Sequence, residues 1–184
     1  MITLLSGTNR SGSNTRKITA ILEGIYQRLG VEYRVLDLQE LPPALFTPTA
    51  YFEKPAAFEP FSKQILASDG VVVVTPEYNG SFPGVLKLFV DHLKFPESFE
   101  QRPVCYVGLA AGMWGALRSV EQLQAIFGYR NAHNFPGRVF MPGIGGLLDD
   151  QGQLKDAELL GRLERQAAEF VAFVERLRAV KLKG

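Results

Sequence analysis

The feature that most constrains the fold of this chain is a regular alternation of short apolar runs with longer amphipathic stretches. Each apolar run has the length and composition of a β-strand. The expected strands lie at residues 2–5, 33–38, 71–74, 104–109 and 138–141. The run at 71–74 consists only of valine, which is typical of a strand that is buried on both faces of a parallel sheet.

Between these runs, apolar residues recur at three- and four-residue steps, which is the period of an α-helix. The clearest example combines Ile18, Ile21, Leu22 and Ile25 on one helix face. The expected helices span approximately residues 13–30, 61–68, 83–93, 117–127 and 154–179. The five prolines between positions 42 and 60 predict a long irregular connection there.

Five strand–helix units in succession predict an α/β fold, a doubly wound parallel sheet with helices on both faces. Five strands favour the flavodoxin-like strand order 2-1-3-4-5 over the six-stranded dinucleotide-binding order. We expect right-handed crossovers. With 184 residues, the chain is expected to form a single domain, 1–184, with residues 181–184 as a solvated tail.

Charge and composition narrow the class of protein. Lys and Arg number 20 and Asp and Glu 19, so the net charge of +1 predicts no basic surface for nucleic acid. No apolar run approaches the roughly 18 residues of a membrane span, and the first residues do not resemble a signal peptide. Because the sequence contains a single cysteine, Cys105, a Cys-rich metal site is excluded. We expect Cys105 to be a buried, inert thiol. We therefore expect a cytoplasmic protein with no membrane or nucleic-acid partner.

Ligands of open parallel sheets bind beyond the carboxyl ends of the strands, where the strand order reverses. In the order 2-1-3-4-5 this point lies between the first and third strands. The loops that reach it are residues 6–15, 76–83 and 110–115.

The loop at 6–15 has the composition of a phosphate site. It places small hydroxyl and amide side chains, two glycines and Arg10 between a strand and a helix. Helix N-termini attract phosphate, and an arginine pairs with phosphate oxygens through two hydrogen bonds. The simpler alternative is that one or two of these hydroxyl and amide groups only cap the helix.

This loop departs from two well-known nucleotide motifs. Gly7 and Gly12 have the spacing of the P-loop glycines, but Ser13 and Asn14 stand where that motif requires Lys and Ser or Thr. Asn9 replaces the second glycine of the dinucleotide fingerprint. A terminal phosphate monoester is therefore favoured over a nucleoside triphosphate or a dinucleotide.

The two other loops have compositions that suit a flat ligand. In 76–83, the Tyr78 ring and the Asn79 amide can hold a planar heteroaromatic group, although an ordinary Asn-Gly turn before a proline is the alternative. In 110–115, small residues around Gly112 allow close backbone approach to such a ring. Trp114 can cover the ring or lie at a subunit contact.

Residues 7–15 (Gly-Thr-Asn-Arg-Ser-Gly-Ser-Asn-Thr) and 76–87 (Pro-Glu-Tyr-Asn-Gly-Ser-Phe-Pro-Gly-Val-Leu-Lys) together resemble the NADPH-dependent FMN reductases, a family that includes quinone, chromate and azo-dye reductases. The resemblance implies a binding site for FMN made by the three loops. The implied phosphate-binding residues are Arg10, Ser13, Asn14 and Thr15, with Thr8 close by. The implied ring-binding residues are Pro76, Glu77, Tyr78, Asn79 and Gly80, with Ala111, Gly112 and Gly115 on the other side of the ring.

The resemblance also implies an activity and an assembly. We expect an FMN-dependent oxidoreductase that passes electrons from NADPH to FMN, quinones or similar small acceptors. The flavin supplies the chemistry, so no catalytic side chain is expected. Family members are commonly homodimers or homotetramers, and the aromatic residues near positions 46, 52 and 95 provide apolar surface for an interface.

Two alternatives remain open at this point. The first is a flavodoxin-type electron carrier, which a net charge of +1 disfavours because such carriers are strongly acidic. The second is a flavin-binding module without turnover. Consumption of NADPH in the presence of FMN and a quinone distinguishes the enzyme from both.

Overall fold

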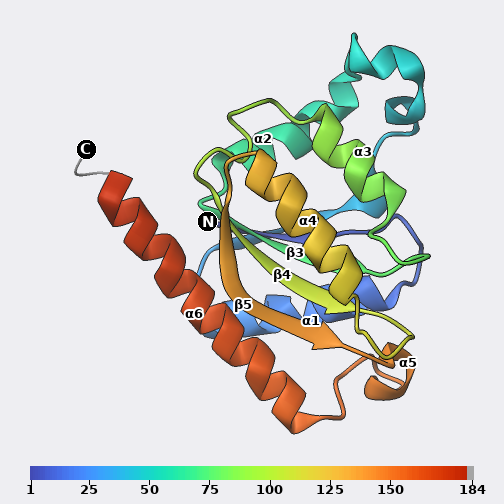
Figure 1. The fold of residues 1–184 in the computed structure, drawn as a ribbon, viewed down its shortest axis with the longest axis vertical. Coiled ribbons are helices and arrows are strands. Elements are labelled where there is room, and N and C mark those ends of the chain that lie inside the picture. The colour runs from blue at the N-terminus through green and yellow to red at the C-terminus, as the bar shows by residue number, and fades with distance from the viewer. Residues whose placement is uncertain (182–184) are drawn as a thin grey trace.

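The computed structural model describes residues 1–181. Its centre is a five-stranded sheet of order β2-β1-β3-β4-β5 in which every strand pair is parallel (Figure 1). The strands are β1 (Ile2–Ser6), β2 (Tyr33–Asp37), β3 (Gly70–Pro76), β4 (Pro103–Leu109) and β5 (His133–Met141). The expected flavodoxin-like fold and strand order are confirmed.

Helices cover both faces of the sheet (Figure 1). They are α1 (Asn14–Arg28), α2 (Glu59–Ala67), α3 (Gly84–His92), α4 (Leu117–Tyr129), the short α5 (Ile144–Leu147) and α6 (Ala157–Lys181). Among residues 1–181, no helix is long and apolar enough to cross a membrane. Of the solvated tail expected at 181–184, Lys181 ends α6 and the other residues lie outside the described part of the chain.

The strand period divides the core into two layers. Alternate residues of a strand point to opposite faces of its sheet. Val72 and Val74 pack on one face with the apolar residues of α1 and α6. Val71 and Val73 pack on the other face with those of α2, α3 and α4. All residues of β3 and β4 are buried, as the valine-rich composition predicts for central parallel strands.

The structure corrects several predicted boundaries. Strand β5 begins at His133 rather than 138, because Pro136 and Gly137 interrupt its apolar pattern where the pairing with β4 changes register. Helix α6 begins at Ala157 rather than 154, and Asp156 accepts hydrogen bonds from its first amides. Helix α5 was not expected, because its four residues are too few to show a helical period.

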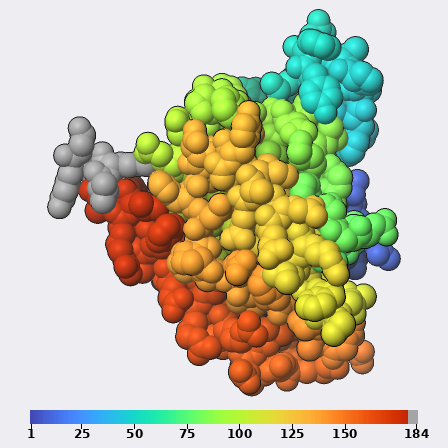
Figure 2. All heavy atoms as spheres, viewed as in Figure 1, coloured from blue at the N-terminus to red at the C-terminus, as the bar shows by residue number. Residues whose placement is uncertain are grey.

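The connection rich in prolines is irregular, as expected, but it contains short 3-10 turns. Three of them span Pro43–Phe46, Pro48–Tyr51 and Ala56–Phe58. Figure 2 shows this part of the chain, in cyan, standing out from the body of the molecule. Its side chains Leu45 and Phe58 are buried in the same core layer as the apolar residues of α3, and the centre of the Phe58 ring lies 6.0 Å from that of Phe89.

Candidate functional site

The loops after β1, β3 and β4 meet at the carboxyl ends of the strands and enclose a cavity of about 360 Å³. This is the edge of the sheet at which the strand order predicts a ligand. Of the predicted site residues, the cavity lining brings together Arg10, Ser13, Asn14, Thr15, Pro76, Glu77, Tyr78 and Ala111. Ser11, Gly12, Leu109, Ala110 and Ile144 complete the lining.

One end of the cavity is formed by the amino end of α1. Ser13 caps this helix, because its Oγ accepts a hydrogen bond of 3.2 Å from the amide of Arg16. Within the described residues 1–181, the backbone N–H groups of residues 11–15 donate to no protein acceptor. Free amides and the positive end of the helix dipole favour an anion. Arg10 lies exposed at the same end and adds a full positive charge.

The opposite end is formed by the loop after β3. Tyr78 and Ser81 exchange backbone hydrogen bonds of 2.8 and 3.1 Å and so close a tight turn. Asn79 and Gly80 occupy its tip with φ angles of 52° and 80°. They therefore form an Asn-Gly turn, which is the alternative interpretation of this sequence, and they do not line the cavity. Their contact with a flavin stays a prediction.

Thr8 also lies outside the cavity lining, and its contribution is indirect. Its side chain is buried, and Oγ1 lies 3.1 Å from the hydroxyl of Tyr78. The same oxygen accepts a hydrogen bond from the amide of Arg10. Thr8 thus connects the loop after β1 with the loop after β3.

Two glycines near the site are required by the packing of the backbone. A Cβ on Gly7 would lie 2.6 Å from the carbonyl oxygen of Val74, so a side chain there would separate β1 from β3. Gly115 has a φ of 56°, and its Cβ would lie 2.9 Å from the nitrogen of Pro142. Gly112 and Gly115 are absent from the cavity lining, so their predicted contact with the ring remains a prediction.

The sequence did not identify Arg118 as a site residue. It comes from the first turn of α4, and its Nη1 donates a 3.0 Å hydrogen bond to Oε1 of Glu77. Its guanidinium carbon also lies 5.8 Å from the centre of the Trp114 ring. The available signal is Glu77 itself, because an acidic side chain that becomes largely buried requires a cationic partner.

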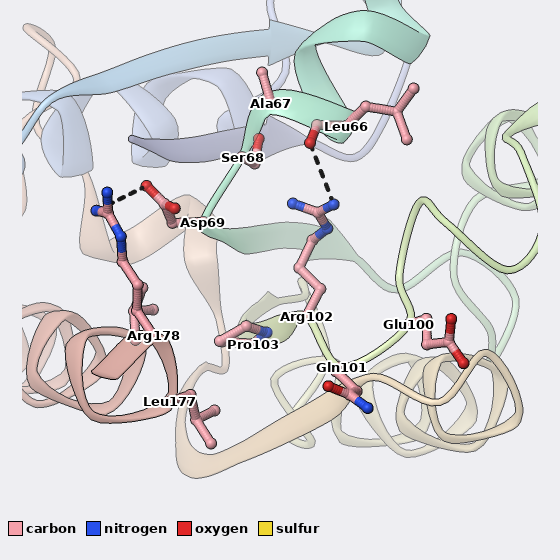
Figure 3. Close-up of a pocket in the computed structure, with 11 residues that line it drawn as sticks. Leu66, Ala67, Ser68, Asp69, Glu100, Gln101, Arg102, Pro103, Leu177 and Arg178 are labelled. Carbon is pink, nitrogen blue, oxygen red and sulfur yellow. Dashed lines mark hydrogen bonds and ion pairs between the residues drawn. The ribbon is translucent and has the colours of Figure 1, made fainter. Parts of the chain in front are cut away.

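A second cavity, of about 240 Å³, lies at the amino ends of β3 and β4 (Figure 3). Asp69 pairs there with the amino terminus and, at 3.6 Å, with Arg178. Arg102 donates to the carbonyl oxygens of Ser98 and Leu66 at 2.6 and 3.4 Å. Burial lowers the pKa of Arg102, which the surrounding carbonyl groups keep hydrogen-bonded. These charged groups already have protein partners, so we regard this cavity as structural.

The fold and the first cavity together define a class of protein. A parallel sheet of order 2-1-3-4-5 carries, at its switch point, one cavity that is lined by the amino end of a helix and by the loops after β3 and β4. This is the arrangement of a flavodoxin-like protein with a mononucleotide site. Free amides at a helix terminus and an arginine are groups that bind phosphate in general.

Comparison with known proteins identifies the family. Residues 1–145 match the NADPH-dependent FMN reductase family. The chain is 30% identical over 179 residues to an NAD(P)H-dependent FMN reductase of Pseudomonas aeruginosa, covering 95% of each protein. It is 35% identical over 128 residues to a quinone reductase of Escherichia coli, covering 67% of this chain and 68% of that protein.

The fold is also found in solved structures. The flavoenzyme NAD(P)H:(acceptor) oxidoreductase FerB from Paracoccus denitrificans superposes with a TM-score of 0.81 at 21% identity, covering 95% of this chain and 97% of that one. The chain therefore belongs to the NADPH-dependent FMN reductase family. It is an FMN-dependent NAD(P)H oxidoreductase, and the expected family, activity and cofactors are confirmed.

Proposed function

We propose that the cavity of about 360 Å³ holds FMN, with the phosphate at the amino end of α1 and the ring between residues 76–78 and Ala110–Ala111. The observation that supports this proposal most strongly is the set of free amides at 11–15, which share one cavity with Pro76 and Tyr78. When bound, the flavin supplies the hydride and electron chemistry.

In this proposal the protein binds and orients, and no side chain acts as a general acid or base. Arg10 and the amides of 11–15 hold the phosphate. The bond between Thr8 and Tyr78 keeps the two ends of the site at a constant separation. Ala110 and Ala111 are small enough to let the ring approach the end of β4 closely.

We propose NADPH as the preferred donor and FMN, quinones or similar small molecules as acceptors. The E. coli relative is named as a quinone reductase, and a Bacillus relative that is 27% identical over 143 residues is named as an NADPH azoreductase. One open ring face, used first by the donor and then by the acceptor, gives ping-pong kinetics. Such a reaction draws on cytoplasmic NADPH, and we place the protein in that compartment.

The experiment is anaerobic mixing of FMN-loaded protein with NADPH, followed by a quinone. We expect the flavin absorbance to bleach with NADPH and to return when the quinone is added, with NADH slower than NADPH. If the flavin stays oxidised at saturating NADPH, the result would support the alternative that the protein is a flavin-binding module without turnover. Bleaching that no small acceptor reverses would instead favour a carrier that docks with a protein partner.

We also propose that the protein is a homodimer or a homotetramer. Phe95 and Tyr129 are 59% and 77% exposed beside an apolar groove of about 480 Å³ between α3 and α4. Phe52, in the projecting segment, is 92% exposed. Exposed apolar groups of this kind favour association. Light scattering should return at least twice the chain mass of 20.4 kDa, and a value near 20.4 kDa at micromolar concentration would contradict the proposal.

A further inference from the structure

The wall of the cavity contains a carboxylate with one partner. The side chain of Glu77 is 11% exposed, and its Oε1 accepts the hydrogen bond from Nη1 of Arg118. Its other oxygen, Oε2, is buried and has no hydrogen-bond partner among the described residues 1–181. Arg118 is therefore the group that neutralises Glu77 directly. Removal of this cation would leave a buried negative charge beside the cavity.

Arg118 belongs to a set of side chains on α4 that hold the loop after β3. Ser119 donates to the carbonyl oxygen of Pro76 at 3.2 Å. Gln122 donates to the carbonyl oxygen of Gly80 at 3.3 Å and accepts a 2.5 Å bond from Ser81. The position of the loop therefore does not depend on Arg118 alone, so the charge of Arg118 can be removed while these contacts remain.

The position of Arg118 is fixed on its second side by Trp114. The guanidinium carbon lies 5.8 Å from the centre of that ring, within the range of a cation–π interaction. The Arg118 side chain is half exposed, whereas that of Glu77, which lines the cavity, is 11% exposed. This arrangement holds a positive charge close to Glu77 and to the loop that lines the cavity.

We propose that Arg118 is a positioning residue that, by neutralising Glu77, sets the relative affinity of the site for reduced and oxidised FMN. The proposal rests on the proposed location of FMN in this cavity. Two-electron reduction adds negative charge to the flavin ring system. An unpaired carboxylate in the wall repels that charge strongly, because charges interact more strongly in a buried site than in water.

The experiment uses Arg118→Gln, Glu77→Gln and the double variant in the full-length protein. The dissociation constant of oxidised FMN and the two-electron midpoint potential of bound FMN are measured for each. Arg28→Gln is the matched control, because Arg28 forms a 2.8 Å pair with Glu164 on the surface of α1 and α6. This control should retain the wild-type values.

We expect Arg118→Gln to weaken binding of reduced relative to oxidised FMN about tenfold, which lowers the two-electron potential by about 30 mV. Glu77→Gln should shift the potential upward, because it leaves the positive charge of Arg118 without its partner. In the double variant both charges are absent. The ratio of its affinities for reduced and oxidised FMN should therefore lie within about threefold of the wild-type ratio, and the potential should return accordingly. If Arg118→Gln does not fold, the opposite shift in Glu77→Gln still tests the proposal.

Other outcomes would overturn the inference. An unchanged potential in Glu77→Gln would show that the flavin does not sense this charge. A double variant that keeps the shift of Arg118→Gln would show that Arg118 acts without Glu77. A rise in KM for NADPH alone, at constant potential, would assign Arg118 to donor binding. If the wild-type protein does not bind FMN, the result would contradict the proposed function and therefore this inference as well.

Discussion

The hydroxyl of Tyr78 lies 3.1 Å from Oγ1 of Thr8, although the two residues are 70 positions apart in the sequence. Thr8 is buried beneath the loop at the amino end of α1, and Tyr78 lines the cavity from the loop after β3. The bond therefore joins the loop before α1, at one end of the cavity, to the opposite wall. Both residues were predicted as site residues, but their contact was not.

Loss of this bond should weaken FMN binding. Tyr78→Phe removes the hydroxyl and keeps the ring, and a hydrogen bond of this kind contributes about 0.5–1.5 kcal/mol. The affinity for FMN should therefore fall roughly two- to tenfold, measured by quenching of flavin fluorescence. Tyr129→Phe, at an exposed position of α4, is the control and should bind normally. Equal affinities of Tyr78→Phe and wild type would show that the bond does not organise the site.

The assignment of Arg10 to the phosphate predicts discrimination between two flavins. Arg10→Ala should weaken the binding free energy of FMN by about 1.5–3 kcal/mol, which is the contribution of a hydrogen bond to a charged group. Riboflavin lacks the phosphate, so its affinity should change much less. Titration calorimetry with both ligands measures the difference, with Arg34→Ala on the exposed side of β2 as the control. Equal losses for the two flavins would place Arg10 away from the phosphate.

Much of the fold and part of the site could be predicted from local patterns. The valines at 71–74 indicate a central strand, because a strand of a parallel sheet is buried on both faces and all its side chains are then apolar. The position of the loop at 6–15 beside the ligand cavity could be predicted, because it follows a strand and its small polar residues leave the backbone amides accessible. In the structure, Arg10 and Tyr78 line the same cavity, and their contacts with FMN stay a prediction.

The remaining features depend on contacts between distant segments. Arg118 lies 41 positions from Glu77, and nothing in the helical pattern of α4 distinguishes it from a solvent-exposed arginine. Ile144 lines the cavity only because the chain turns back after β5 through a helix of four residues. The amino-terminal half of β5 could not be recognised because Pro136 and Gly137 are unfavourable in regular strands.

Arg102 should contribute to stability and not to flavin binding. It lies at the amino ends of the strands, where it donates to the carbonyl oxygens of Ser98 and Glu97. It also donates to the carbonyl oxygen of Leu66, a bond that Figure 3 shows. Arg102→Met keeps much of the side-chain volume but leaves these oxygens without their charged donor. We expect the free energy of unfolding to fall by about 1.5–3 kcal/mol in urea denaturation. A loss of FMN affinity at unchanged stability would indicate that this cavity also serves the ligand.

The thiol of Cys105 should be unreactive in the folded protein. Cys105 is 1% exposed within β4, and burial raises the pKa of its thiol well above the ordinary value. Because the thiolate is the reactive form, raising the pH from 7 to 9 should produce little modification by a thiol reagent. In denaturant the thiol should react completely, and the rate in native buffer should follow the opening of the core.

Two measurements test this behaviour. The rate of modification is compared with and without urea, and Cys105→Ala is assayed for turnover. The variant should keep its activity and lose about 1 kcal/mol of stability, because a small buried apolar group is removed from the core. Stoichiometric modification within minutes in native buffer, with the fold intact by circular dichroism, would show that β4 is accessible. A loss of turnover in a stable Cys105→Ala variant would show that the thiol takes part in the reaction.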